Sequence, residues 1–153
     1  GQALQEEMLE SRKKYKGYIS LFAPDEELFF LHLLLHQYKE SELMFMVERS
    51  KELDLYKLAD IYYLWREGSL DEARIKKLAR AYGIEKKAGA VLRQAGTVFD
   101  DEALLCAAEE YGFEEPRVLD FAAGKKYRWT TGERKRIAVF DAGEYLRETE
   151  DDR

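Results

Sequence analysis

Apolar residues recur every three or four positions from Ala3 to Gly112, which is the spacing of amphipathic helices. The pattern predicts a charged helix over Ala3–Tyr18 and an almost wholly apolar helix over Asp25–Tyr38. A helix that is apolar on all sides lies in the centre of a core or in an oligomer interface. Further helices are expected to begin near Ser41, Leu55, Ser69, Lys86 and Asp100 or Asp101.

Capping residues set the expected ends of these helices. Pro24 and Asp25 suit a first helical turn, because proline is tolerated there and an acid complements the helix dipole. Ser69 and Glu72 have the spacing of a capping box, which predicts a helix start at Ser69. Glycine follows the last apolar position of several stripes and favours a helix end; these glycines are Gly68, Gly83, Gly96, Gly112 and Gly124.

Near the C-terminus the apolar period changes from helical to two residues. Pro116 opens a short helix up to Gly124, and then Tyr127–Trp129 and Lys135–Phe140 alternate around a turn at 130–133. Two alternating runs of this kind predict a β-hairpin. A last helix is expected after the hairpin, capped by Asp141 and Glu144.

These elements predict a mainly α fold of ordinary globular composition. An N-terminal helical bundle is expected over residues 1–98, a small winged-helix-like module with one β-hairpin over residues 99–148, and a polar tail over residues 149–153. A chain of 153 residues fits one domain or two small ones. Only two prolines and ten glycines are present, which argues against a long disordered segment.

Charge is distributed unevenly along the sequence. The formal net charge of −6 argues against binding of polyanions by the whole surface. Between residues 125 and 136, however, six basic residues stand against Glu133 alone. The sequence therefore predicts an acidic body that carries one basic patch, formed by Lys125, Lys126, Arg128, Arg134, Lys135 and Arg136.

The single cysteine and the termini bear on the compartment. Cys106 lies in an apolar helical stretch, which predicts a buried thiol that acts as a small hydrophobic side chain. The N-terminus has neither the basic nor the apolar region of a signal peptide. The most apolar run, Leu28–Leu35, is shorter than the roughly 20 residues of a membrane span. We expect a cytoplasmic protein without a membrane partner.

Four residues have the spacing of a helix-turn-helix: Ala108, Gly112, Val118 and Phe121. A small residue in the first helix permits a close crossing, a glycine makes the turn, and two apolar residues seat the second helix. The predicted basic hairpin and the acid-capped helix follow in chain order.

This order resembles the excisionase-like and MerR-type winged helix-turn-helix family over roughly the last third of the chain. The resemblance implies that Arg117 and its neighbours face the major groove of DNA. It also implies that the wing contacts phosphates or the minor groove through Lys125, Lys126, Arg128, Arg134, Lys135 and Arg136. Glu114 and Glu115 depart from the family pattern, because carboxylates at the start of the second helix repel phosphate.

Two functions remain open at this point. The first is a DNA-binding accessory or regulatory protein that contacts double-stranded DNA through the winged module. The second is a helical protein–protein interaction module that keeps this geometry without reading DNA. In either case the Asp25–Tyr38 helix is a candidate surface for a protein partner or for self-association.

An enzyme receives no support from the sequence. It contains neither a Gly-x-Ser-x-Gly nucleophile motif nor a glycine-rich phosphate loop. His32 and His36 are four residues apart, which is metal-ligand spacing, but the sequence has no third histidine. We therefore expect no catalytic residues, no metal and no cofactor.

Overall fold

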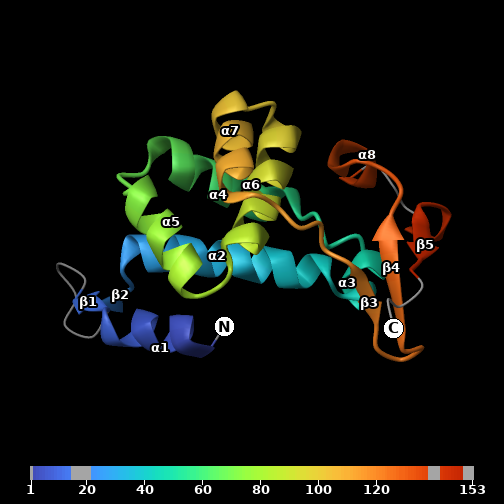
Figure 1. The fold of residues 1–153 in the computed structure, drawn as a ribbon, viewed down its shortest axis with the longest axis horizontal. Helices are drawn as coiled ribbons and strands as arrows, with labels where there is room; N and C mark the ends of the chain where they lie inside the picture. The colour runs from blue at the N-terminus through green and yellow to red at the C-terminus, as the bar shows by residue number, and fades with distance from the viewer. Residues whose placement is uncertain (1, 15–21, 138–141, 150–153) are drawn as a thin grey trace.

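The computed structural model describes residues 2–14, 22–137 and 142–149, and it is mainly helical, as the sequence predicts (Figure 1). The helices are α1 (Gln2–Glu10), α2 (Glu26–Ser41), α3 (Met44–Glu48), α4 (Leu55–Glu67), α5 (Glu72–Ala81), α6 (Glu85–Phe99), α7 (Glu102–Tyr111) and α8 (Glu133–Ile137). The strands are β1 (Lys13–Lys14), β2 (Phe22–Ala23), β3 (Val118–Asp120), β4 (Lys125–Trp129) and β5 (Leu146–Glu148).

Helix α2 is the central element of the helical part. It runs along the middle of the molecule and packs against α1, α4, α5 and α6 (Figure 1). Asp25 caps its N-terminus by accepting a hydrogen bond from the Leu28 amide at 3.3 Å. The interpretation of this segment as a core helix is confirmed, since its buried side chains are Leu28, Phe30, Leu31, Leu34, Leu35 and Tyr38.

Helices α6 and α7 form a close antiparallel pair. Asp101 caps α7 as predicted and accepts from the Leu104 amide at 2.9 Å. A Cβ at Gly89 would overlap the carbonyl oxygen of Gly112, so the helices approach at a distance that only glycine permits. The prediction that Gly96 ends a helix is wrong: it lies within α6, where a Cβ would lie 3.0 Å from the Leu105 side chain.

Gly68 ends α4 as predicted, with an extended backbone (φ −73°, ψ 159°) and not a left-handed one. Two other predicted helix ends differ from the structure. Helix α5 begins after Asp71, whose carboxylate accepts from the Arg74 amide, while the Ser69 hydroxyl lies 3.3 Å from Glu26. Helix α1 ends at Glu10 because the chain turns into β1, which pairs with β2. The predicted end of that helix lies outside the described residues.

The prediction of a second helix for the helix-turn-helix is wrong. Residues Val118–Asp120 form β3, an antiparallel partner of β4. The Leu119 amide donates to the Glu42 carbonyl at 2.7 Å, so a segment distant in sequence supplies the other edge of the strand. The Asp120 carboxylate accepts from two amides of the following turn, and Gly124 has a φ of 65° there. Gly124 is therefore a hairpin residue and not a helix cap.

The predicted hairpin and last helix are also replaced by other elements. Strand β4 pairs with β3 and β5, in the order β3-β4-β5. Residues Glu133–Ile137 form α8, which replaces the end of the expected turn and the start of the expected strand Lys135–Phe140. The amides of Lys135 and Arg136 donate to the Gly132 carbonyl. Ala142–Glu144 is one turn of 3₁₀-helix. Residues 138–141 lie outside the described residues.

Two clusters of buried apolar side chains hold these elements. The larger joins α1, α2 and α4–α7 and includes Leu104, Ala108 and Tyr111, so the boundary expected near residue 98 falls inside it. The smaller comprises Val47, Val118, Trp129 and Leu146 and packs α3 against the inner face of the sheet. None of the described helices has both the length and the apolar character that a bilayer span requires.

Candidate nucleic-acid interface

The three-stranded sheet sorts the basic residues of the C-terminal region onto two faces. Alternate residues of a strand point to opposite sides of a sheet. On β4, Trp129 packs into the smaller core, so Tyr127 and Lys125 share its inner face. Lys126 and Arg128 consequently lie on the outer face, and both are exposed.

The register places further cations on this outer face. Arg128 lies directly opposite Arg147 of β5, and Leu119 lies opposite Lys126. Arg117 immediately precedes β3, so extending the register by one residue puts it opposite Arg128 on the other side. We call Arg117, Lys126, Arg128 and Arg147 the outer-face cations; all four are exposed.

The strands contribute no acidic side chain to this outer face. The alternation puts Asp120 and Glu148 on the inner face, where they lie opposite Lys125 and Tyr127. The Arg147 guanidinium donates to the carbonyls of Glu144 and Leu146, at 3.1 and 2.9 Å, and not to a carboxylate of the described residues. The side chains that the described strands place on the outer face are therefore cationic or apolar.

Arg147 is a further cation of this face that does not belong to the basic patch predicted from the sequence. It stands alone between Leu146 and Glu148, outside the basic run, and therefore gave no cluster signal. The one available signal was the alternation of buried Leu146 with its polar neighbours, which is typical of a strand and not of the predicted helix. Only the pairing of β4 with β5 brings Arg147 beside Arg128.

Lys125 takes part in an ion pair at the end of the sheet. Its Nζ lies 2.8 Å from the Glu148 carboxylate. The hydrogen bond to Glu148 raises the pKa of Lys125 above its ordinary value, so the amine is charged and already has a counter-ion. Lys125 thus lies on the opposite face of the sheet from Lys126, its neighbour in the predicted patch.

The basic residues of α8 are also divided. Arg134 donates from Nε to the Thr97 carbonyl at 2.6 Å and lies 2.9 Å from the Asp100 carboxylate, so it links α8 to the end of α6. Lys135 is exposed. Arg136 is buried, with 3% of its side chain exposed. The structure therefore does not bring the three together on one accessible surface.

Arg136 has the contacts of a structural residue. Its guanidinium lies 3.2 Å from the Glu133 carboxylate and 5.1 Å from the centre of the Trp129 ring. Burial lowers the pKa of Arg136, while the nearby carboxylates, Glu133 foremost, act to raise it. A buried guanidinium with a carboxylate partner holds α8 on the sheet and is inaccessible to a phosphate.

The β3–β4 turn carries an exposed aromatic ring. Phe121, predicted to seat the second helix, is 77% exposed at this turn. It follows Asp120, whose carboxylate fixes the turn, and stands close in sequence to Lys126 of the outer face. The turn between β3 and β4 therefore carries an exposed aromatic ring.

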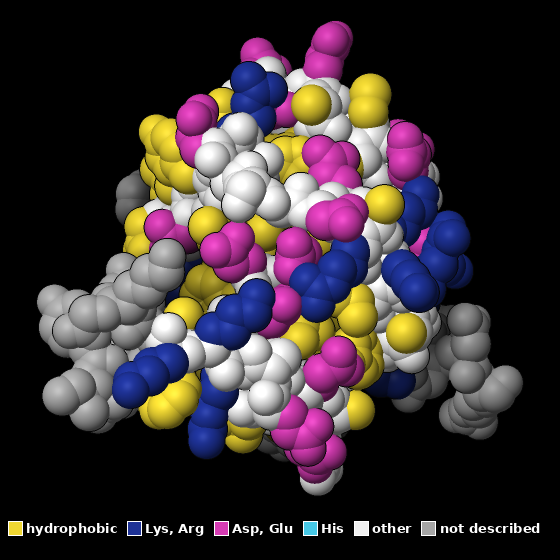
Figure 2. Space-filling view, turned by 90° about the vertical axis from the view of Figure 1, so that its left-hand side faces the viewer, with side chains coloured by type: hydrophobic (Ala, Val, Ile, Leu, Met, Phe, Trp, Pro, Cys, Tyr) yellow, Lys and Arg dark blue, Asp and Glu magenta, His cyan; other side chains and the backbone are white. Residues whose placement is uncertain are grey.

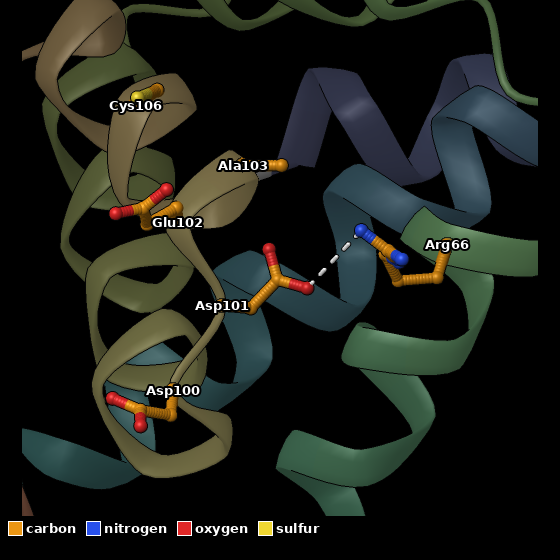
Figure 3. A pocket seen from close by; sticks show the side chains of 6 residues that line it. All are labelled: Arg66, Asp100, Asp101, Glu102, Ala103 and Cys106. Atoms are coloured by element: carbon orange, nitrogen blue, oxygen red, sulfur yellow. Dashed lines mark ion pairs between the residues drawn. The ribbon is translucent and has the colours of Figure 1, made fainter.

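An acidic hollow of about 750 Å³ lies at the junction of α6 and α7 (Figure 3). Asp101 caps α7 and its carboxylate also lies 3.4 Å from Arg66. Asp100 pairs with Arg134 and Cys106 is exposed at this hollow, which corrects the prediction of a buried thiol. The carboxylates of Asp100 and Asp101 are occupied by capping and ion pairs, so this part of the hollow has the contacts of a structural junction.

His32 and His36 share one side of α2, with ring centres 6.2 Å apart. Burial lowers the pKa of His32, and the charges of His36 and Lys39 act in the same direction. Within the described ranges, no group of three or more His, Cys, Asp or Glu side chains has an arrangement suited to a metal ion.

Comparisons with known proteins add no identification. No family model matches the chain, and neither a curated protein nor a solved structure is significantly similar to it.

Proposed function

We propose that this protein binds nucleic acid through the phosphate backbone, using the outer face of its C-terminal sheet. The observation that carries the proposal is the pairing of Arg128 with Arg147, flanked by Arg117. In this proposal a cationic sheet surface contacts the nucleic acid in place of a groove-reading helix. The proposal therefore does not depend on the winged-helix resemblance.

The pairing of Arg128 with Arg147 has an electrostatic cost. Residues directly opposite in an antiparallel pair have Cβ atoms about 4.5–5.5 Å apart, and like charges there destabilise the sheet. Arg147 has no carboxylate acceptor among the described residues, so the cost is not offset by a counter-charge there. Phosphate groups would supply that counter-charge, and release of their condensed counter-ions would add to the affinity.

The spacing of the cations suits a polyanion better than one small anion. Neighbouring strands lie about 4.7–4.9 Å apart, so three strands spread Arg117, Arg128 and Arg147 over about 10 Å. Guanidinium groups bind phosphate oxygens in a bidentate way, which gives each residue its own phosphate. The acidic remainder of the surface repels nucleic acid, so we expect binding to be confined to this face.

The expected mode is contact with the backbone, with little discrimination between sequences. The described strands place cations and Leu119 on the outer face, and cations that contact phosphate position a protein without reading bases. We therefore expect similar affinities for random duplexes of different base composition, and a strong dependence on salt.

Fluorescence anisotropy of a labelled random duplex, titrated at several salt concentrations, tests the proposal. Replacing Arg128 by Gln should reduce the slope of log Kobs against log salt by about 0.9. The variant Arg128→Glu, Arg147→Glu should abolish binding at physiological salt. Unchanged affinity in that variant would exclude the outer face as the binding surface.

A matched control is available at the other end of the molecule. Lys77 and Arg80 are exposed on α5, where acidic and basic side chains are interspersed on the surface (Figure 2). The variant Lys77→Glu, Arg80→Glu changes the net charge by the same amount and should retain binding. Equal losses in both variants would mean that total charge, and not the outer face, governs the affinity.

Absence of binding by the unaltered protein at low salt would favour the alternative function, a helical protein–protein interaction module. One observation supports that alternative on its own: an apolar surface over α1, α2 and α4 that the described residues leave uncovered.

A further inference from the structure

One side of α2 is not covered by the helices around it. The helix packs against α6 on its buried side, and α1 and α4 flank it. Phe29 and His36 are exposed, and His32 and Leu33 are half-buried, so all four project from the opposite side. Together with the adjoining sides of α1 and α4 they form a surface that we call the α1/α2/α4 face.

Two grooves on the α1/α2/α4 face run beside α2. The groove toward α1, of about 670 Å³, is lined by Met8, Leu9, Phe22, Pro24 and His32, with Gln5 and Arg12. The groove toward α4, of about 450 Å³, is lined by Phe29, Leu33, Tyr63 and Leu64, with Asp60, Glu67 and Gly68. Both grooves are mainly apolar, and α2 forms the ridge between them.

Large apolar side chains on this face are exposed to a degree unusual for a surface with no partner. Leu9 is 62% exposed, Phe22 54% and Tyr63 60%, and Phe29 is also exposed between them. Contiguous exposed apolar patches mark interaction sites in folded proteins.

The charges at the two edges of the α1/α2/α4 face indicate which partner would cover it. Arg12 lies at the α1 edge, and its guanidinium carbon is 5.3 Å from the centre of the Phe22 ring. It has no ion pair to a described residue. Asp60 and Glu67 lie at the α4 edge, exposed and likewise without such a pair. The face is thus basic at one edge, acidic at the other and apolar in the middle.

A face with this polarity is complementary to itself. A two-fold axis that lies between the two copies and runs parallel to α2 brings the α1 edge of one copy against the α4 edge of the other. Arg12 of each copy then approaches the acidic edge of its partner, while the two α2 ridges pack together. We infer that the α1/α2/α4 face is the interface of a homodimer, with α2 at its centre and Arg12 paired with Asp60 or Glu67 across it.

Sedimentation equilibrium over a range of protein concentrations tests this inference. We expect a monomer–dimer equilibrium. Leu33→Glu places two like charges near the axis and should raise the dissociation constant by about tenfold or more. Phe121→Glu, which adds the same charge at a distant and exposed position, should leave the dissociation constant unchanged.

A charge-reversal series decides whether the edges pair as described. Arg12→Glu should weaken the dimer, and so should Asp60→Lys with Glu67→Lys. Combining all three substitutions in one chain should restore the dimer, because the reversed edges are again complementary. The folding of each variant is checked by circular dichroism. The charge-reversal series changes only exposed residues, so it still tests the interface if Leu33→Glu fails to fold.

Three results would overturn the inference: a monomer at every concentration, a dimer insensitive to Leu33→Glu, or charge reversals that do not rescue each other. These outcomes are independent of nucleic-acid binding, because the outer-face cations lie on a separate surface. A monomer that binds the duplex, or a dimer that does not, separates the two proposals.

Discussion

Arg128 of β4 and Arg147 of β5 are directly opposite residues in neighbouring antiparallel strands. Each is exposed, and Arg147 uses its guanidinium hydrogen bonds on backbone carbonyls. A pairing of like charges in this position opposes folding, so its effects on stability and on binding are expected to have opposite signs.

Arg147→Glu tests this opposition. The substitution converts a like-charge pair into an opposite-charge pair, so the free energy of unfolding should rise by about 0.2–1 kcal/mol. Affinity for a random duplex should fall at the same time, since a phosphate contact becomes repulsive. Urea unfolding and anisotropy on the same preparation measure both quantities. A loss of both stability and binding would indicate a structural role for Arg147 and contradict the proposal.

The helical part of the fold was predictable because its signals are local. Asp25 caps α2 and Asp101 caps α7 at positions that the sequence indicates, and in both cases the amide that donates to the capping carboxylate is three residues further along the chain. The apolar stripe of α2 likewise follows from spacing along a single helix. Nothing in these features depends on the placement of distant segments.

The C-terminal module was not predictable in the same way. Val118 and Leu119 fit a helix or a strand equally well as short apolar runs. The choice is made by the Glu42 carbonyl and by β4, which supply the hydrogen bonds of β3 on either side. The same non-local pairing selects the candidate site: it places Arg117, Lys126 and Arg128 on one face of the sheet and adds Arg147. Lys125 lies on the opposite face, and the other predicted cations lie on α8.

Arg136 is expected to act on stability and not on binding. Replacing it by Ala removes the nearer of the two cations at the buried Glu133 carboxylate and leaves Arg93 at 3.7 Å, and breaking a buried pair costs about 3–5 kcal/mol. Thermal or urea unfolding measures the loss. The double variant Glu133→Gln, Arg136→Met should recover part of it, because no uncompensated charge then remains buried. An Arg136→Ala protein of unchanged stability that no longer binds the duplex would show instead that Arg136 contacts the ligand.

The link between α2 and α5 should make stability depend on pH. Arg74 lies 3.0 Å from the Asp25 carboxylate and also pairs with Glu27. Burial alone would raise the pKa of Asp25, but hydrogen bonds from Arg74 and from the Leu28 amide outweigh it, so the pKa lies below its ordinary value of 3.8. A lowered pKa in the folded state stabilises the protein above the unfolded pKa, and the stabilisation disappears as pH falls through the folded pKa.

Arg74→Met removes the main stabilising partner of the Asp25 carboxylate. The difference in unfolding free energy between the unaltered protein and this variant should be largest at neutral pH and should shrink below about pH 4. Urea unfolding at a series of pH values measures it. Arg80→Met on the same helix, which removes an exposed pair with Glu85, serves as the control and should show a much smaller effect. A difference for Arg74→Met that is constant with pH would contradict the assignment.

Gly89 sets the distance between α6 and α7, and its replacement should reveal how rigid that contact is. A Cβ at this position would overlap the Gly112 carbonyl oxygen and lie 3.0 Å from Tyr111 Cβ, so one helix must move. We expect Gly89→Ala to lower the free energy of unfolding by about 1–3 kcal/mol, as overpacking of a close contact does. Gly132→Ala is the matched control, since no atom lies within 4 Å of its added Cβ, and its effect should stay within about 0.5 kcal/mol. Equal stabilities of the two variants would contradict this expectation. They would mean that the larger core tolerates a shift of α6 away from α7 without loss of stability.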